Sequence, residues 1–334
     1  MTTPPLIFRA AHLRLFIGVF RENGVPVEQA LARSPLPRSI ETQPDAYVSL
    51  PLALPWMAHT GRDLTTMELG YLGSRDVSLG ALDVRLQSSI LSAVSGLQRL
   101  EHALRLATIE DSALVGAMRW EGEHLRVSIA MPRLARHPHA CLVEWVNLQA
   151  MIAVVRSVAG PAWAPQEMTL VSRAEVPGVA LEAFGMTRVR SGHPLTSILV
   201  EREALLPAGT LPHRPAAPLT DEAAPWTFAA ALRSAIQPYV VAGEVPVSLP
   251  QVAELVGTSP RTLQRRLKVS GTTYAQIVQQ ARFDLARQWL GDASLKVGEI
   301  AAMAGYENPQ HFSRAFRKLA GVTPSDYRLL TAAR

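Results

Sequence analysis

Two short runs of polar and basic side chains, each directly after a proline, stand out near the C-terminal end of the chain. The first run contains Arg261, Thr262, Gln264, Arg265 and Lys268, and the second contains Gln310, His311, Ser313, Arg314, Arg317 and Lys318. Arginine can donate two hydrogen bonds to guanine O6 and N7, and glutamine can pair in the same way with adenine. Serine, threonine and lysine can bind phosphate. The two runs therefore predict contacts with bases and backbone of double-stranded DNA.

Each run is expected to lie on a helix that its preceding residues start. Ser259-Pro260 and Asn308-Pro309 are typical of an N-cap residue followed by proline in the first turn, where the missing N–H is not needed. Large apolar side chains follow each proline at intervals of three and seven residues, and these are Leu263 and Leu267, then Phe312 and Phe316. That spacing places them on one buried face and turns the polar residues outward.

A second helix is expected to precede each of these helices. Short amphipathic segments at 249–256 and 297–304 end at turns that contain Gly257 and Gly305, and the outward helices then occupy 260–268 and 309–319. Helix, short turn and helix form the helix-turn-helix motif, whose second helix enters the major groove. A solvated helix face is the alternative for one copy, but two copies share the same cap, core and basic positions.

A longer helix at 274–290 is predicted between the copies, with an apolar stripe of Ile277, Val278, Ala281, Leu285 and Trp289. At 1.5 Å per residue this helix is about 25 Å long. If the stripe packs on both units, it fixes their separation. The two outward helices could then enter successive major grooves about 34 Å apart on one side of the duplex.

At this point the C-terminal hundred residues resemble the DNA-binding domain of the AraC/XylS family of bacterial transcription regulators. The resemblance rests on VAELVGTSPRTLQRRL from Val252, RFDLARQWL from Arg282, and IAAMAGYENPQHFSRAFRKLAGVTPSDYR from Ile300. It implies transcription activation through contact with RNA polymerase, a small-molecule effector, and an N-terminal domain that binds the effector and forms a homodimer.

The composition divides the chain into two parts. Residues 226–334 contain 13 Lys and Arg against 7 Asp and Glu, whereas residues 1–225 contain 20 against 21. A segment with five prolines separates them, and we expect a linker at 206–225. The predicted domains are residues 1–205, for effector binding and dimerisation, and residues 226–334, for DNA binding. The fold class is therefore multidomain, with an α+β N-terminal domain and an all-α C-terminal domain that includes further helices at 227–242 and 324–331.

Within the N-terminal part, apolar periodicity predicts helices at 6–23, 96–107 and 140–159. Alternation around a turn at Gly122 predicts a β-hairpin over 113–130, and 168–176 and 196–203 are typical of strands. This part resembles, less specifically, the non-cupin domain of ornithine- and virulence-type regulators. The residues concerned are YVSL from Tyr47, FGM from Phe184 and SGHPLTSILV from Ser191.

Other chemistry has little support in the sequence. His137, His139, Cys141 and Glu144 lie close together and could bind a metal ion, but no second ligand pair with regular spacing follows. The chain has no G-x-S-x-G or H-E-x-x-H motif. We therefore expect no catalytic residues, no metal and no cofactor. A single cysteine, the lack of an uncharged apolar stretch of 18 residues and the lack of a signal peptide predict a cytoplasmic protein without membrane contacts.

The hypothesis that follows is a ligand-responsive transcription activator. Two alternatives remain open at this point. One is a constitutive dimeric regulator without a small-molecule ligand, and the other is a metal-responsive sensor.

Overall fold

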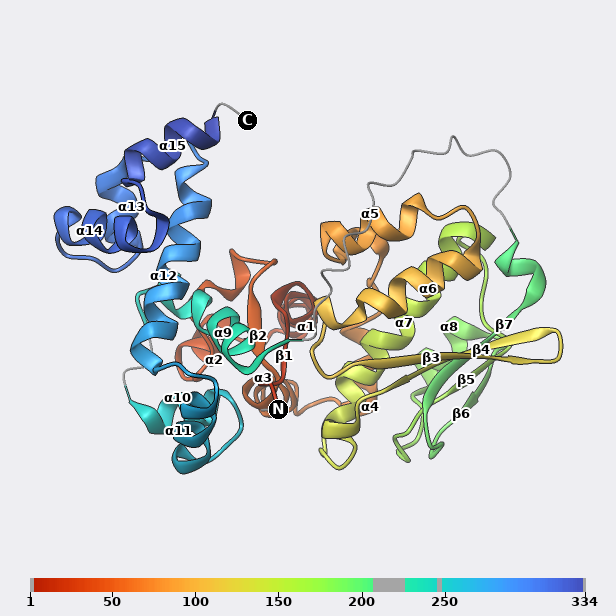
Figure 1. Cartoon of the computed structure of the whole chain (residues 1–334). Coiled ribbons are helices and arrows are strands. Elements are labelled where there is room, and N and C mark those ends of the chain that lie inside the picture. Colours follow the sequence, from red (N-terminus) through yellow and green to blue (C-terminus); the bar gives the residue numbers. More distant parts are fainter. Residues whose placement is uncertain (1–2, 207–225, 245–247, 333–334) are drawn as a thin grey trace.

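The computed structural model describes residues 3–206, 226–244 and 248–332. All described strands belong to the N-terminal part, and the described residues from Phe228 onward form helices joined by short turns. Figure 1 shows the larger sheet on one side of the molecule and the C-terminal helices on the other. The α+β and all-α classes predicted from the sequence are confirmed. Most of the predicted linker, residues 207–225, lies outside the described residues.

The chain starts with a strand where the sequence predicted a helix. β1 (Ile7–Arg9) pairs antiparallel with β2 (Tyr47–Ser49), and α1 (Ala10–Glu22) begins directly after it. The prediction of one helix over 6–23 was therefore wrong for its first residues. Backbone hydrogen bonds to residues far along the chain decide this, because the N–H of Arg9 also donates to the carbonyl of Glu110 at 3.0 Å.

The remaining helices of the N-terminal part are mostly short. They are α2 (Val27–Ala32), α3 (Leu50–Thr60), α4 (Thr66–Leu72), α5 (Val84–Ser92), α6 (Gly96–Leu106), α7 (Ala140–Ala159) and α8 (Gly178–Phe184). The predicted helices at 96–107 and 140–159 correspond to α6 and α7. By length and composition α7 could span a membrane, but 72% of its most apolar 18-residue window is buried inside the protein. It is the central helix of the N-terminal core.

Five strands form the larger sheet, in the order β3-β4-β7-β5-β6. Their bounds are β3 (Val115–Glu121), β4 (His124–Ala130), β5 (Glu167–Thr169), β6 (Arg188–Arg190) and β7 (Thr196–Glu201). The predicted hairpin is β3 and β4, with its turn at Gly122. β5 is shorter than predicted, and the sequence did not predict β6, which pairs parallel with β5. Side chains of β4 and β7 share a hydrophobic core with α6 and α7, and Figure 1 shows these two helices across one face of the sheet.

The helices of the C-terminal part agree closely with the predicted ranges. They are α9 (Phe228–Ala242), α10 (Leu249–Leu255), α11 (Pro260–Val269), α12 (Tyr274–Leu290), α13 (Val297–Met303), α14 (Pro309–Ala320) and α15 (Pro324–Ala332). Side-chain caps start six of these predicted helices. The side chains of Thr227, Ser248, Ser259, Thr273, Asn308 and Thr323 each accept a hydrogen bond from a backbone N–H of the first turn.

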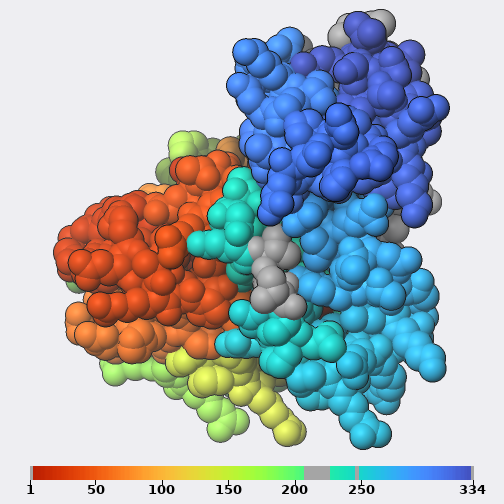
Figure 2. Space-filling model, turned by 90° about the vertical axis from the view of Figure 1, so that its left-hand side faces the viewer, coloured from red at the N-terminus to blue at the C-terminus, as the bar shows by residue number. Residues whose placement is uncertain are grey.

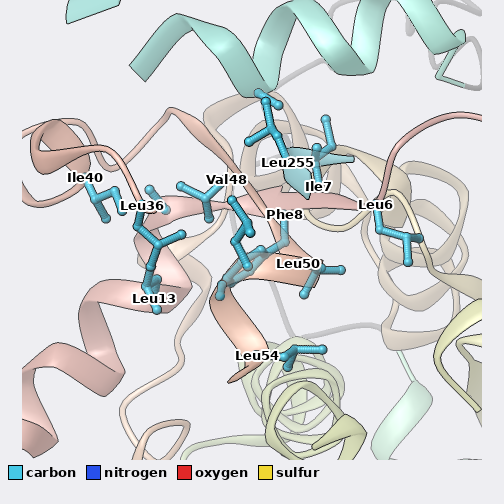
Figure 3. Packing of buried hydrophobic residues seen from close by; sticks show 14 of the residues in the cluster. Leu6, Ile7, Phe8, Leu13, Leu36, Ile40, Val48, Leu50, Leu54 and Leu255 are labelled. Carbon is cyan, nitrogen blue, oxygen red and sulfur yellow. The ribbon is translucent and has the colours of Figure 1, made fainter. Parts of the chain in front are cut away.

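Buried apolar residues gather in three clusters, and one of them joins the N-terminal part to the first helical unit of the C-terminal part. This shared core joins side chains of β1, α1, β2 and α3 to side chains of α9, α10, α11 and the first half of α12. Figure 3 shows Leu255 of α10 among Ile7, Phe8 and Val48 in this cluster. A second cluster lies between α4–α7 and the larger sheet, and a third, smaller one lies among α12–α15. The first helical unit is thus built into the N-terminal part, whereas the second has a core of its own.

Candidate nucleic-acid interface

The first helix-turn-helix unit consists of α10 and α11. The Ser259 side chain accepts a hydrogen bond from the backbone N–H of Thr262 at 3.3 Å, and Pro260 follows in the first turn. Leu263 and Leu267 are buried in the shared core. The predicted contact residues Arg261, Gln264, Arg265 and Lys268 are exposed, and Thr262 is partly exposed. All five residues of the first run therefore lie on the accessible side of α11.

The second unit consists of α13 and α14 and is built in the same way. The Asn308 side chain accepts from the backbone N–H of Gln310 at 2.7 Å. Phe312 and Phe316 are each 2% exposed. The centroid of the Phe316 ring lies 4.9 Å from that of the Phe283 ring on α12. The predicted residues Gln310, His311, Arg314, Arg317 and Lys318 are exposed, and Ser313 is partly exposed. The apolar side of α14 is thus fixed to α12, and its polar side is left accessible.

The turns between the paired helices require glycine. Gly257 has φ of +60° and Gly305 has φ of +74°, a left-handed conformation that side chains with a Cβ disfavour. Space is short as well. A Cβ at Gly257 would lie 2.9 Å from Cγ of Pro51, and one at Gly305 would lie 3.1 Å from Nη2 of Arg282. The two turns are therefore held against α3 and α12, respectively.

Helix α12 belongs to the cores of both units. Ile277, Ala281 and Leu285 are buried in the shared core, whereas Ala286 and Leu290 are buried in the third cluster. The 17 residues of α12 correspond to about 25 Å. Figure 1 shows the two units at opposite ends of this helix, and Figure 2 shows them one above the other on the same face of the molecule. The prediction that this helix packs on both units is confirmed.

The predicted contact cations on the two outward helices differ from the other described arginines of the C-terminal part. Among the described residues, none of the six predicted cations on α11 and α14 takes part in an ion pair. Arg233 by contrast pairs with Asp284 at 3.0 Å, and Arg282 lies over the Tyr306 ring at 5.4 Å. Arginines with structural partners thus lie between helices. The six unneutralised cations remain available to a polyanion such as DNA.

Polar contacts that join α9 and the first unit to the N-terminal part were not predicted. Ser49 of β2 donates to the carbonyl of Leu255 at 2.6 Å. The hydroxyl of Tyr239 on α9 donates to the carbonyl of Pro35 at 2.6 Å, and Arg38 pairs with Glu244 at 2.9 Å. No local pattern marks these residues, because each partner lies about two hundred positions away in the sequence.

The four residues weighed as metal ligands lie at the start of α7 and just before it. Cys141 is buried in α7, and burial raises the pKa of its thiol. Burial also raises the pKa of Glu144, although its carboxylate accepts hydrogen bonds from Thr196 and from the backbone of Val171 and Ser172. His137 precedes the helix. Within the described part of the chain, no three potential ligands of these types come together.

Comparison with known proteins assigns the C-terminal part. Residues 252–329 match the family described as "Helix-turn-helix domain". The "Ornithine utilization regulator" of Pseudomonas aeruginosa is 44% identical over 86 residues, which are 26% of this chain and 25% of the relative. The "Transcriptional activator NphR" of a Rhodococcus species is 34% identical over 85 residues, a quarter of either chain. The chain thus spans about a quarter of the length of these curated relatives.

One solved structure is similar over more of the chain. The transcriptional regulator CdpR from Pseudomonas aeruginosa has 22% sequence identity, with 79% of this chain and 86% of that chain covered and a TM-score of 0.34. Because that score is low, the arrangement of the N-terminal part is described from its own contacts alone and not from this similarity. Residues 252–329 are a helix-turn-helix domain of the AraC type. The resemblance predicted from the sequence is confirmed for this part of the chain.

Proposed function

We propose that this protein is a sequence-specific transcription regulator that reads two successive major grooves of its operator. The observation that carries the proposal is the structural equivalence of α11 and α14. Each starts at a capped proline, each buries the residues three and seven positions later, and each exposes its predicted contact side chains. Such a helix presents a polar, basic surface of the width that the major groove admits.

The two helices have separate tasks in this proposal. Arg261, Thr262, Gln264 and Arg265 read one groove, and Gln310, His311, Ser313, Arg314 and Arg317 read the next. Lys268 and Lys318, at the C-terminal ends of the two helices, bind phosphate, as do the helix N-termini. Since α12 fixes both units within one chain, two half-sites can be read by a single polypeptide.

We assign regulation to residues 1–205, with 206–225 as the linker and 226–334 as the DNA-binding domain. In this proposal the N-terminal domain binds a small-molecule effector and forms a homodimer in the cytoplasm, and the bound regulator activates transcription through RNA polymerase. The protein has no catalytic activity of its own. The shared core supports a regulatory link, because the first unit packs on β1, β2 and α3.

A constitutive dimer is the second candidate function. The same shared core could hold the first unit in its DNA-binding orientation without any ligand. The two candidates differ in one measurement, which is the affinity for operator DNA with and without small molecules. An effector at a hundred times its dissociation constant also stabilises the protein by about 2.7 kcal/mol, and no compound would do so for a constitutive dimer.

Selection of bound fragments from random duplex DNA tests the core of the proposal. We expect an enriched site with two conserved blocks whose centres are about 10 base pairs apart. Substitution of Arg265 by alanine should relax selection in one block, and substitution of Arg314 should relax it in the other. Substitution of Arg173, which is exposed in the N-terminal part and belongs to neither unit, provides a control variant that selects the same site. Enrichment of a single block, or of none, contradicts the proposal.

A further inference from the structure

An apolar cavity lies in the N-terminal part between β1, α1, α5, α6 and α7. Its volume is about 60 Å³, and most of its wall is hydrocarbon. Leu82, Leu86, Leu100, Leu104, Ile129 and Met151 contribute to this wall. An apolar wall favours an apolar ligand group, and a few polar groups then fix its orientation.

One end of this cavity is polar. His12, Glu110, Asp111 and Asn147 all line it, and each is at most 6% exposed. The Glu110 carboxylate is already occupied. It accepts hydrogen bonds from His12 Nε2 at 2.7 Å, from Arg9 Nη1 at 3.2 Å and from the backbone N–H of Asp83. Burial opposes ionisation, but these donors outweigh it and lower the pKa of Glu110.

His12 has an unused nitrogen at this end of the cavity. In the ring tautomer that donates its Nε2 proton to Glu110, Nδ1 is an acceptor with a free lone pair. That Nδ1 is buried and has no hydrogen-bond partner. Buried polar atoms without a hydrogen-bond partner are rare in folded proteins, and a buried acceptor such as Nδ1 is expected to bind a donor. A ligand N–H or O–H would supply it.

Asp111 is the second acceptor and has no positive partner. One of its carboxylate oxygens accepts from the backbone N–H of Ala113 at 2.7 Å, and no cation of the described residues forms an ion pair with it. Burial raises the pKa of Asp111 to about 7. The basic groups whose charges act on Asp111 are His12, which is bound to Glu110, and Arg133, whose guanidinium donates to the carbonyl of Pro4. A ligand cation would therefore compensate a buried carboxylate that the chain leaves unpaired.

We propose that this cavity binds a small primary alkylamine. The ammonium group donates to Asp111 and to His12 Nδ1, and the alkyl chain lies among the leucines. The Asn147 side chain, whose amide nitrogen is directed at the Met131 sulfur at 3.5 Å, offers its carbonyl oxygen to the third N–H. A carboxylate ligand would be repelled by Asp111, and an alcohol would leave the charge unpaired. Since a cavity of about 150 Å³ holds benzene, this one accommodates a chain of about three carbons.

The polar end of the cavity is attached to the strand that contacts the first DNA-binding unit. Residues 110–112 run beside β1, where Ser112 N–H donates to the carbonyl of Ile7 at 2.9 Å and Phe8 bridges to Asp111. Phe8 lines the cavity and also belongs to the shared core with Leu255. β1 thus lies between the cavity and α10. The role of this cavity as an effector site rests on the proposed function. In that role, the bound ligand changes the affinity for DNA, and bound DNA changes the affinity for the ligand by the same factor.

Isothermal titration of the full chain at pH 8 tests the site, with n-propylamine as the probe and 1-propanol and propionate as matched probes. We expect saturable binding of n-propylamine at least tenfold tighter than that of 1-propanol, and none of propionate. The variant Asp111→Asn should lose this preference, whereas Asp76→Asn, whose side chain is 74% exposed, should keep it. Ala103→Leu, which fills the cavity wall, should abolish binding of both neutral and charged probes.

Equal binding of the amine and the alcohol overturns the proposal, as does an unchanged preference in Asp111→Asn. Titration of operator DNA separates this site from the proposed function. If n-propylamine binds as expected and DNA affinity is unchanged, the amine site stands and its effector role is refuted. If the chain binds no DNA with or without amine, the proposed function fails, while the titrations still decide the amine site.

Discussion

Substitution of Phe316 by alanine should unfold the second helix-turn-helix unit while the rest of the protein stays folded. Phe316 is 2% exposed. Its ring packs against those of Phe283, Phe312 and Tyr327, with ring centroids 4.9–5.8 Å apart. Removal of a buried phenylalanine costs about 3–5 kcal/mol. The third cluster contains only seven buried residues, and so small a core has little more stability than this to lose. The first unit is secured by the much larger shared core.

Hydrogen–deuterium exchange measures this effect segment by segment. In the Phe316→Ala variant we expect α13, α14 and α15 to lose protection, whereas α1, α9 and α10 keep it. Leu330→Ala provides the matched control, because that side chain is 62% exposed and its loss should change nothing. A uniform loss of protection across the chain would show that the second unit is not a separate core and would refute the reasoning.

Three further predictions concern single contacts. Gly305→Ala places a Cβ in a left-handed turn 3.1 Å from Arg282, which should cost about 1–2 kcal/mol and weaken binding of one half-site in footprinting. Ser49→Ala removes the hydrogen bond to Leu255 and should lower the free energy of urea unfolding by about 1 kcal/mol, with Ser191→Ala as an exposed comparison. Burial raises the pKa of Asp111 to about 7, so the folded protein binds this proton more tightly than the unfolded chain does. Protonation of Asp111 therefore stabilises the fold fully below about pH 4, and this stabilisation is lost as the pH rises to about 7. Asp111→Asn should therefore be more stable than the parent chain, by an amount that grows across this range to roughly 4 kcal/mol. A pH-independent difference would contradict that assignment.

The C-terminal part was predictable because its signals are local. A cap, a proline and two apolar residues at fixed spacing define α11 and α14, and the same residues turn the contact side chains outward. The glycines at 257 and 305 mark both turns. None of these signals depends on a distant partner.

The parts that the sequence did not predict depend on distant partners. Ile7–Arg9 continues the apolar pattern of the helix that follows, and only pairing with β2 and with residues 110–112 makes it a strand. The shared core joins residues about two hundred positions apart, as the hydrogen bond from Ser49 to Leu255 shows. The cavity likewise combines His12 with Asp111 and Asn147. A single sequence does not show which of its many apolar faces will meet.

The most direct test of the central claim is a binding titration in which each base pair of the selected site is replaced in turn. The account predicts that Arg265→Ala and Arg314→Ala each weaken binding by about 1–3 kcal/mol and become insensitive to replacements in different blocks, about one helical turn apart. If both variants lose affinity uniformly over all sequences, the two arginines are phosphate contacts. If both become insensitive to the same base pairs, α11 and α14 do not read successive grooves.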